Sequence, residues 1–203
     1  MDLLGDVLAA VRELALDQAS DPVLGPASLV ATMVDVLPES RNVIPDLAVV
    51  TIDWRVLPGD DDDALVSRMR SAIAARVSPS PTGLSYEVRI ATELQRTYTG
   101  QEEESSLFTP GFLMDSQHPV VTAAAEAVGR RGAPARAADV RPWQFATDGG
   151  WSCGVHGIPT VGFAPGEEHF AHTNRERIEV EEARWGFERY PHLISAVQRA
   201  VSN

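Results

Sequence analysis

One alternating segment and the helical pattern behind it constrain this chain more than any other feature. Residues 47–57 (LAVVTIDWRVL) place Val49, Thr51, Asp53 and Arg55 on one face and Val50, Ile52, Trp54 and Val56 on the other. A period of two is typical of a strand with one buried face. The turn PGDDDD follows, and apolar residues then recur every four positions at Leu65, Met69, Ile73 and Val77. We therefore predict a strand and a helix, with the acidic residues between them capping the helix.

Patterning along the rest of the chain predicts two regions of different organisation. Before the acidic turn, we expect a helix at about 3–18 and a strand at 27–36; after it, a strand at 84–92. The order helix, strand, strand, helix, strand is a ferredoxin-like split βαβ layout without its first strand. Residues 93–116 lack periodicity. Beyond them we expect a helix at 118–128, strands at 137–141 and 159–163, and a long helix at 180–201.

Charge and cysteine content narrow the class of function. The 203 residues carry 29 acidic and 17 basic side chains, all of the latter arginine, for a net charge of −12. That sign argues against nucleic-acid phosphates and anionic membrane surfaces as partners. No stretch reaches the roughly 18 apolar residues of a membrane span, and acidic residues interrupt the first apolar run, so no signal peptide is expected. With Cys153 as the sole cysteine, no internal disulfide can form, and a cytoplasmic setting is expected.

A loop rich in histidine and carboxylate lies between the predicted strand 159–163 and the last helix. Segment 162–176 (GFAPGEEHFAHTNRE) contains His169 and His172 among three glutamates. Imidazole and carboxylate groups are zinc donors, and loops that follow strands commonly carry sites. The loop is therefore a candidate metal site, with a solvated acidic turn as the alternative.

Two other segments offer groups to a ligand. In FATDGG (145–150), Thr147 and Asp148 precede paired glycines, which permit a close backbone approach or a positive φ angle, and whose amides can bind an anionic group. A tight turn is the alternative. Asn42 and Arg55 lie thirteen residues apart, and an arginine on a strand offers a planar fork to a carboxylate, although a solvated arginine fits equally. We predict no nucleophile at Cys153, because GxSxG spacing and a placed base are missing.

Two runs resemble one known family. RNVIPDLAVVTIDWRVLPG (41–59) is similar to the lid, or dimerisation, domain of the zinc amidohydrolases and peptidases that include succinyl-diaminopimelate desuccinylase, acetylornithine deacetylase, aminoacylase and glutamate carboxypeptidase. FATDGGWSCGVHGIPTVGFAPGEEHFAHTNRE (145–176) resembles the last part of that family's catalytic domain. The resemblance implies an α/β chain: an incomplete ferredoxin-like α+β lid at 1–100, a connector at 101–116, and the C-terminal portion of an α/β zinc-peptidase catalytic domain at 117–203.

The resemblance also implies roles for individual residues. His172, in FAHTNRE, matches the family's final zinc-binding histidine, whereas His169 matches no ligand. Arg55 matches the arginine that engages the substrate carboxylate, which implies a carboxylate-bearing amide as substrate. The positions that match substrate-contacting residues are Asn42 and Arg55 in the lid and Thr147, Asp148, Gly149 and Glu168 in the catalytic part.

The departures from the family are equally informative. In relatives, the first zinc-binding histidine, the bridging aspartate, the glutamates that serve as base and ligand, and one more acidic ligand all precede the lid. The lid's opening strand, which in relatives carries a histidine that stabilises the oxyanion in the neighbouring subunit, is also lacking. One histidine cannot hold two metal ions about 3.5 to 4 Å apart. We therefore expect no catalytic residue in this chain, weak or partial zinc binding at most, and no amide hydrolysis by the chain alone.

Three hypotheses remain open from the sequence. The first is a truncated or split half of a dinuclear-zinc hydrolase of N-acyl amino acids or peptides, which forms a homo-oligomer or pairs with a complementary N-terminal half. The second is a non-catalytic oligomerisation module, because an incomplete lid sheet exposes a strand edge. The third is a mononuclear metal-binding or ligand-binding protein that uses Glu168, His169, His172 and Glu176.

Overall fold

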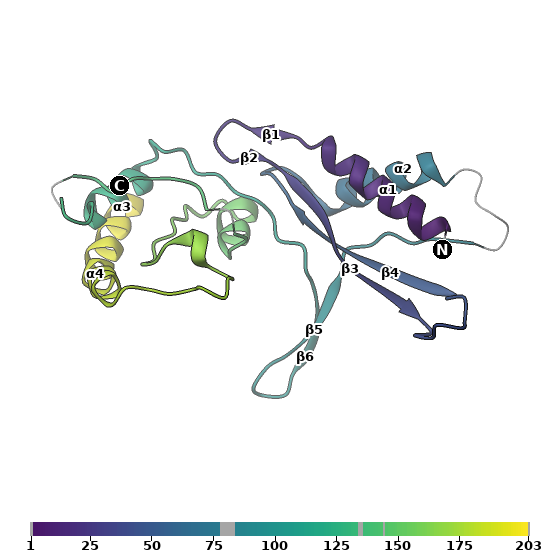
Figure 1. Cartoon of the computed structure of the whole chain (residues 1–203). Helices are drawn as coiled ribbons and strands as arrows, with labels where there is room; N and C mark the ends of the chain where they lie inside the picture. Colours follow the sequence, from purple (N-terminus) through teal and green to yellow (C-terminus); the bar gives the residue numbers. More distant parts are fainter. Residues whose placement is uncertain (1, 78–83, 134–135, 144, 203) are drawn as a thin grey trace. The chain divides into compact units, whose positions relative to one another are not determined.

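The chain divides into two compact units, Met1–Gly111 and Phe112–Asn203, whose helices and strands are labelled in Figure 1. The computed structural model describes residues 2–77, 84–133, 136–143 and 145–202. The division falls within 101–116, the range predicted as a connector, while the domain assignment itself stays a prediction. Within the described ranges, no helix is both long and apolar enough to cross a membrane.

An antiparallel hairpin forms the centre of the first unit. Strand β3 (Ser28–Leu37) pairs with β4 (Leu47–Arg55) along its whole length, with one irregularity near Met33. The predicted strand at 47–57 is confirmed, since Ile52 and Trp54 are partly buried while Asp53 is exposed. Alternation along β4 thus separates a core face from an outer face.

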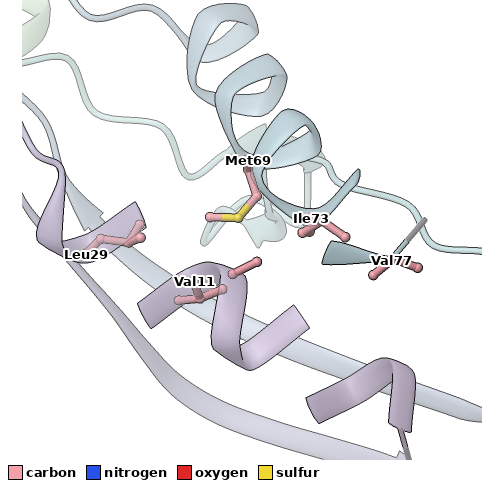
Figure 2. Packing of buried hydrophobic residues seen from close by; sticks show 6 residues of the cluster. Val11, Leu29, Met69, Ile73 and Val77 are labelled. Atoms are coloured by element: carbon pink, nitrogen blue, oxygen red, sulfur yellow. The ribbon is translucent and has the colours of Figure 1, made fainter. Parts of the chain in front are cut away.

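Two helices pack on the core face of this hairpin. Helix α1 (Asp2–Leu16) contacts both β3 and α2 (Asp62–Arg76), so the predicted helices are confirmed. The buried side chains between them form one cluster (Figure 2), because the four-residue spacing along α2 puts its apolar residues on one face. Burying a large apolar side chain contributes about 1.5–3 kcal/mol. The cluster consists of Ala10, Val11, Leu29, Met69, Ile73 and Val77.

The acidic turn before α2 acts as a cap, as the sequence predicts. Asp61 is the N-cap residue, and its Oδ1 accepts a hydrogen bond from Ala64 N at 2.8 Å. Asp62 and Asp63 occupy the first turn, where carboxylates favour the helix dipole. Asp60 Oδ2 accepts from Leu57 N at 2.9 Å and closes the turn after β4.

Two short hairpins complete the first unit. Ser20–Asp21 (β1) pairs with Gly25–Pro26 (β2), and Thr92–Arg96 (β5) pairs with Glu102–Ser106 (β6). The predicted strand at 84–92 is therefore wrong in its extent, because residues 84–91 join no ladder in the described chain and β5 begins only at Thr92. Likewise, the start of the predicted connector is a strand, β6.

The second unit is built on two packed helices. Helix α3 (Pro119–Val128) lies against α4 (Val180–Ser202), and both confirm predicted helices. His118 caps α3 through its Nδ1, which accepts from Val120 N at 3.2 Å. One buried cluster holds Ala124, Val128 and Leu193, with Ala138, Val161, Phe163, Trp185 and Val197 packed against them, and Val120, Val121 and Ala196 of the two helices are buried as well.

The strands predicted at 137–141 and 159–163 are absent from the described part of the second unit. Neither segment has a neighbouring strand there, and a strand without one cannot form a ladder. Phe163 instead makes edge-on contacts with Trp185 and Tyr190, at ring-centroid distances of 5.6 and 5.3 Å. Tyr190 Oη donates to Phe163 O at 2.8 Å. The described residues hold four α-helices and three two-stranded antiparallel sheets, which confirms the mixed α/β class with an α+β first unit.

Candidate functional site

His172 lies in a tight turn after the short 3-10 helix Glu168–Phe170. Its backbone has φ 58°, the one positive φ of a non-glycine residue in the described chain. Its N–H donates to Glu176 Oε2 at 3.0 Å, and its exposed ring contacts Phe145 edge-on with 5.0 Å between ring centroids. A positive φ outside glycine is uncommon and is often found where a side chain is positioned for function. The loop therefore presents this imidazole in a defined orientation.

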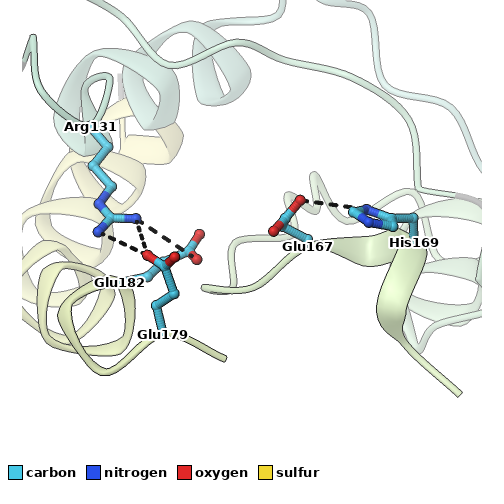
Figure 3. Close-up of polar contacts among 5 residues, drawn as sticks. All are labelled: Arg131, Glu167, His169, Glu179 and Glu182. Carbon is cyan, nitrogen blue, oxygen red and sulfur yellow. Dashed lines mark hydrogen bonds and ion pairs between the residues drawn. The ribbon is translucent and has the colours of Figure 1, made fainter. Parts of the chain in front are cut away.

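The neighbouring charged groups of the loop interact among themselves. His169 Nδ1 lies 3.6 Å from Glu167 Oε2 (Figure 3), with both side chains about three-fifths exposed. The Arg177 guanidinium lies 3.8 Å from the centroid of the Phe170 ring, which also contacts the His169 ring. Exposed ion pairs of this kind contribute little to stability. They do, however, direct His169 toward Glu167.

An ion cluster lies at the other end of this loop. Arg131, which follows α3, lies 3.4 Å from Glu179 and 4.0 Å from Glu182, measured from its Nη1 to their Oε2 atoms (Figure 3). Both glutamates stand at the start of α4, where negative charge is favoured by the helix dipole. The cluster links the segment after α3 to the end of the loop that carries His172.

The residues that the structure describes do not by themselves form a zinc centre. Across the described ranges, no group of three or more histidine, cysteine, aspartate or glutamate side chains could hold a metal ion. Zinc sites in proteins use at least three such ligands. Glu168, His169, His172 and Glu176 are all described, so the mononuclear-metal hypothesis gains no support from the geometry.

The predicted substrate loop at Thr147–Gly149 leads into a π-helix, Gly150–Val155. Thr147 Oγ1 accepts from Gly149 N at 3.3 Å, and Asp148 O accepts from Ser152 N at 3.0 Å. Gly149 has φ −58°, so its backbone suits any residue. A side chain there would meet the Phe112 ring, since an added Cβ would lie 2.4 Å from its atoms. Of the two reasons predicted for a glycine, close approach is thus the one that applies.

Sequence patterning missed the π-helix itself. No residue pattern predicts the i to i+5 hydrogen bonds that define a π-helix. Single-turn π segments are nevertheless frequent at functional sites. Ser152, inside it, shares a hydrogen bond of 2.7 Å with the Thr160 hydroxyl. Ser152 Oγ also lies 3.3 Å from Asp148 O, to which it donates.

Asn42 and Arg55 lie at opposite ends of β4. Asn42 belongs to the loop between β3 and β4, where residues 40–45 line a shallow hollow of about 420 Å³. Arg55 is the last residue of β4 and pairs with Ser28. At about 3.3 Å per residue, the length of β4 separates them by roughly 26 Å. One chain therefore cannot present both side chains to the same small ligand group, and their substrate roles stay predictions.

Comparison with known proteins finds a family match within the first unit. Residues 1–81 match the family model described as a peptidase dimerisation domain. This part of the chain is therefore similar to the dimerisation domains of peptidase-family proteins. The match covers the α1, β3, β4 and α2 arrangement that positions Asn42 and Arg55.

The sequence similarity to two individual proteins extends beyond the first unit. YgeY of Escherichia coli (strain K12), described as an uncharacterized protein, is 26% identical over 175 residues. The protein of the same name from Escherichia coli O157:H7 matches equally. The match covers 86% of this chain but only 41% of each relative. The chain thus spans about two-fifths of the length of these relatives.

Proposed function

We propose that this chain supplies the lid and the last part of the catalytic domain of a dinuclear-zinc amidohydrolase or peptidase. The observation that carries the proposal is the peptidase dimerisation domain at 1–81, followed along the chain by the loop FAHTNRE. In this proposal His172 is a zinc ligand. The remaining ligands and the general base come from polypeptide outside this sequence, because the described residues form no metal site alone.

The proposed substrate is an N-acyl amino acid or a peptide with a free carboxylate. Arg55 would hold that carboxylate, because a guanidinium presents two parallel donors to it. Thr147, Asp148, Gly149 and Glu168 would line the rest of the site. Since Asn42 lies a full strand length from Arg55, the two residues would serve different regions of an assembled site.

Oligomerisation through the first unit is part of this proposal. The face of β3 and β4 turned away from the helices carries exposed apolar side chains, and a group of such side chains is typical of an interface. Opposed pairs on this face include Leu37 with Leu47 and Asp35 with Val49. Leu37, Leu47 and Val49 are each about half exposed. The alternative hypothesis, a non-catalytic oligomerisation module, would use the same face. An activity measurement distinguishes this alternative from a hydrolase.

The test uses material purified from the native source through a tag on this chain, so that any polypeptide with the remaining ligands is retained. We expect zinc-dependent hydrolysis of N-acetyl amino acids or dipeptides. His172→Ala should lower that activity at least about 10²-fold, the scale for loss of one essential group. The matched control is His169→Ala, which removes a nearby exposed histidine and should retain activity.

Two results would overturn the proposal. One is source-purified protein without zinc-dependent hydrolysis, or with activity equal in His172→Ala and the native chain. The other is turnover by the recombinant 203-residue chain alone at the rate of the source-purified protein. The second result would mean that the chain carries a complete site.

A further inference from the structure

Arg189 is a charged residue on the packed face of helix α4. It follows the buried Gly186 by three positions and precedes the buried Leu193 by four, and residues at these spacings share one face of a helix. Arg189 itself is partly buried. Arginine is rarely found on such a face unless a partner of opposite charge lies beside it.

The guanidinium of Arg189 lacks such a partner in the described part of the chain. Its Nε atom is buried and has no hydrogen-bond acceptor there, which is true of no other buried side-chain nitrogen or oxygen in a residue that is not exposed. Arg130, Arg131 and Arg184 of the same unit each pair with a carboxylate. A buried charge without a partner is destabilising, because it loses its hydration and gains nothing in exchange.

Helix α4 supplies no carboxylate to Arg189. The residues three and four positions away on the same face are tryptophan, glycine, histidine and leucine. Glu188 is exposed, and consecutive residues of a helix do not face each other. Glu182, two turns earlier, lies 4.0 Å from Arg131, measured from its Oε2 to Nη1. A partner for Arg189 must therefore come from another segment.

A second face of α4 is also left uncovered. Val180, Phe187, Ile194 and Val201 recur every seven residues, so they share one face, and each is more than half exposed. Phe187 and Arg189, two positions apart, lie on different faces. A helix with apolar side chains on more than one face is typical of a helix packed between layers. Both faces of α4 thus indicate that further polypeptide packs against it.

We propose that a carboxylate side chain from polypeptide outside this sequence pairs with Arg189 and anchors that polypeptide against α4. The inference rests on the proposed function, because it concerns the same polypeptide that supplies the remaining zinc ligands. A carboxylate is the fitting group, since it brings acceptor oxygens and the compensating charge together. More than half of each curated relative lies outside the match, which covers 41% of its length. That length provides the segment from which the carboxylate comes.

The first test compares Arg189→Met in the recombinant chain and in protein purified from its native source through this chain. Methionine keeps most of the apolar stem and removes the charge. We expect the melting temperature of the recombinant chain not to fall, because an unpaired charge is lost. That of the source-purified protein should fall by about 5 °C or more, because a buried carboxylate loses its partner. Any other combination of results would overturn the pairing.

Arg184→Met is the matched control on the same helix. Arg184 is exposed and lies 2.5 Å from Glu181 Oε1 through its Nη1. Exposed pairs of this kind contribute little to stability. We expect this variant to change the melting temperature equally in the two materials, so an opposite response belongs to Arg189 alone. An opposite response of Arg184→Met as well would contradict the assignment to position 189.

A cross-linking experiment identifies the partner. All 17 basic residues of this chain are arginine, so Arg189→Lys introduces its one side-chain amine. A water-soluble carbodiimide joins an amine to an adjacent carboxyl group as an amide. In source-purified Arg189→Lys protein, mass spectrometry should find position 189 joined to an aspartate or glutamate outside this sequence. No cross-link, or a cross-link to a carboxylate of this sequence in the same or a second copy, would overturn the proposal.

Neither readout depends on catalysis. The cross-link and the opposite stability changes, without zinc-dependent hydrolysis, would support the anchor at Arg189 and overturn the proposed hydrolase. Hydrolysis without the cross-link would do the reverse. The two proposals can therefore fail separately.

Discussion

Gly111 contacts backbone rather than side chain. A Cβ added there would lie 3.0 Å from Leu57 C and Pro58 N and 3.2 Å from Val56 O. Backbone cannot rotate out of the way as a side chain can, so we expect Gly111→Ala to destabilise the first unit by about 1–3 kcal/mol. Urea unfolding of the purified variant measures this.

Gly5 supplies the matched control for that substitution. It lies inside α1, and an added Cβ would meet nothing within 4 Å. Alanine is favoured over glycine in a helix by about 0.5–1 kcal/mol, so Gly5→Ala should stabilise the chain. Equal effects of the two substitutions would show that the contact at Gly111 is not close in solution.

An ion pair between α1 and α2 gives stability a pH dependence. Arg76 Nε donates to Glu13 Oε2 at 2.8 Å, and this hydrogen bond lowers the pKa of Glu13 and raises that of Arg76. A carboxyl whose pKa is lower in the folded state stabilises it above the unfolded pKa, about 4.3 for glutamate, and loses that contribution as pH falls. We expect Glu13→Gln to lower the melting temperature slightly at pH 7 and not below pH 3.5. A constant difference at both pH values would contradict this pairing.

At the level of residues, the sequence identified candidate site residues but did not predict the contacts that they make. The glycine at 149 was expected to permit a close approach, yet the Phe112 ring that makes it lies 37 positions away in the chain. The separation of Asn42 and Arg55 along β4 follows from strand geometry once their positions on the hairpin are known. The turn that gives His172 its positive φ has no local signature, because neither glycine nor proline marks it.

Helix α2 offers a prediction at the level of elements. Asp61 caps its first turn through Ala64 N, so Asp61→Ala should cost about 0.5–2 kcal/mol of stability. Asp61→Asn retains a capping oxygen and should stay within a few tenths of a kcal/mol of the native chain. Thermal unfolding of both variants measures the difference. Equal loss in both would assign the effect to charge rather than to the cap.

Element prediction succeeded where a segment is stabilised by its own pattern and failed where it depends on a partner. The four helices and the two strands β3 and β4 were predicted because periodicity and caps are local. Segments 84–92 and 159–163 have the composition of strands, but a ladder also requires a neighbouring strand, which the described chain does not supply. The polar β5–β6 hairpin was missed because TELQR and EEESS carry no apolar alternation, and only Gly100 (φ 84°) marks its turn.

At the scale of the complete chain, the two units differ in how much of their apolar surface is buried by contacts within the unit. The first joins two helices to a hairpin through one buried cluster. Among the described residues, the second buries Ala124, Val128 and Leu193 in one cluster and Val120, Val121 and Ala196 outside it, and leaves Phe187 and Val180 of α4 more than half exposed. Exposed apolar surface of this kind is typical of an interface. It agrees with the proposal that polypeptide outside this sequence completes the site around His172.

The zinc content of the purified protein tests whether polypeptide outside this sequence completes a metal site at His172. Elemental analysis would compare the recombinant 203-residue chain with protein purified from its native source through this chain. We predict no tightly bound zinc in the recombinant chain, two ions per copy of this chain in the source-purified protein, and a loss of zinc in its His172→Ala variant. Two zinc ions in the recombinant chain alone, or none in the source-purified protein, would contradict the proposed function.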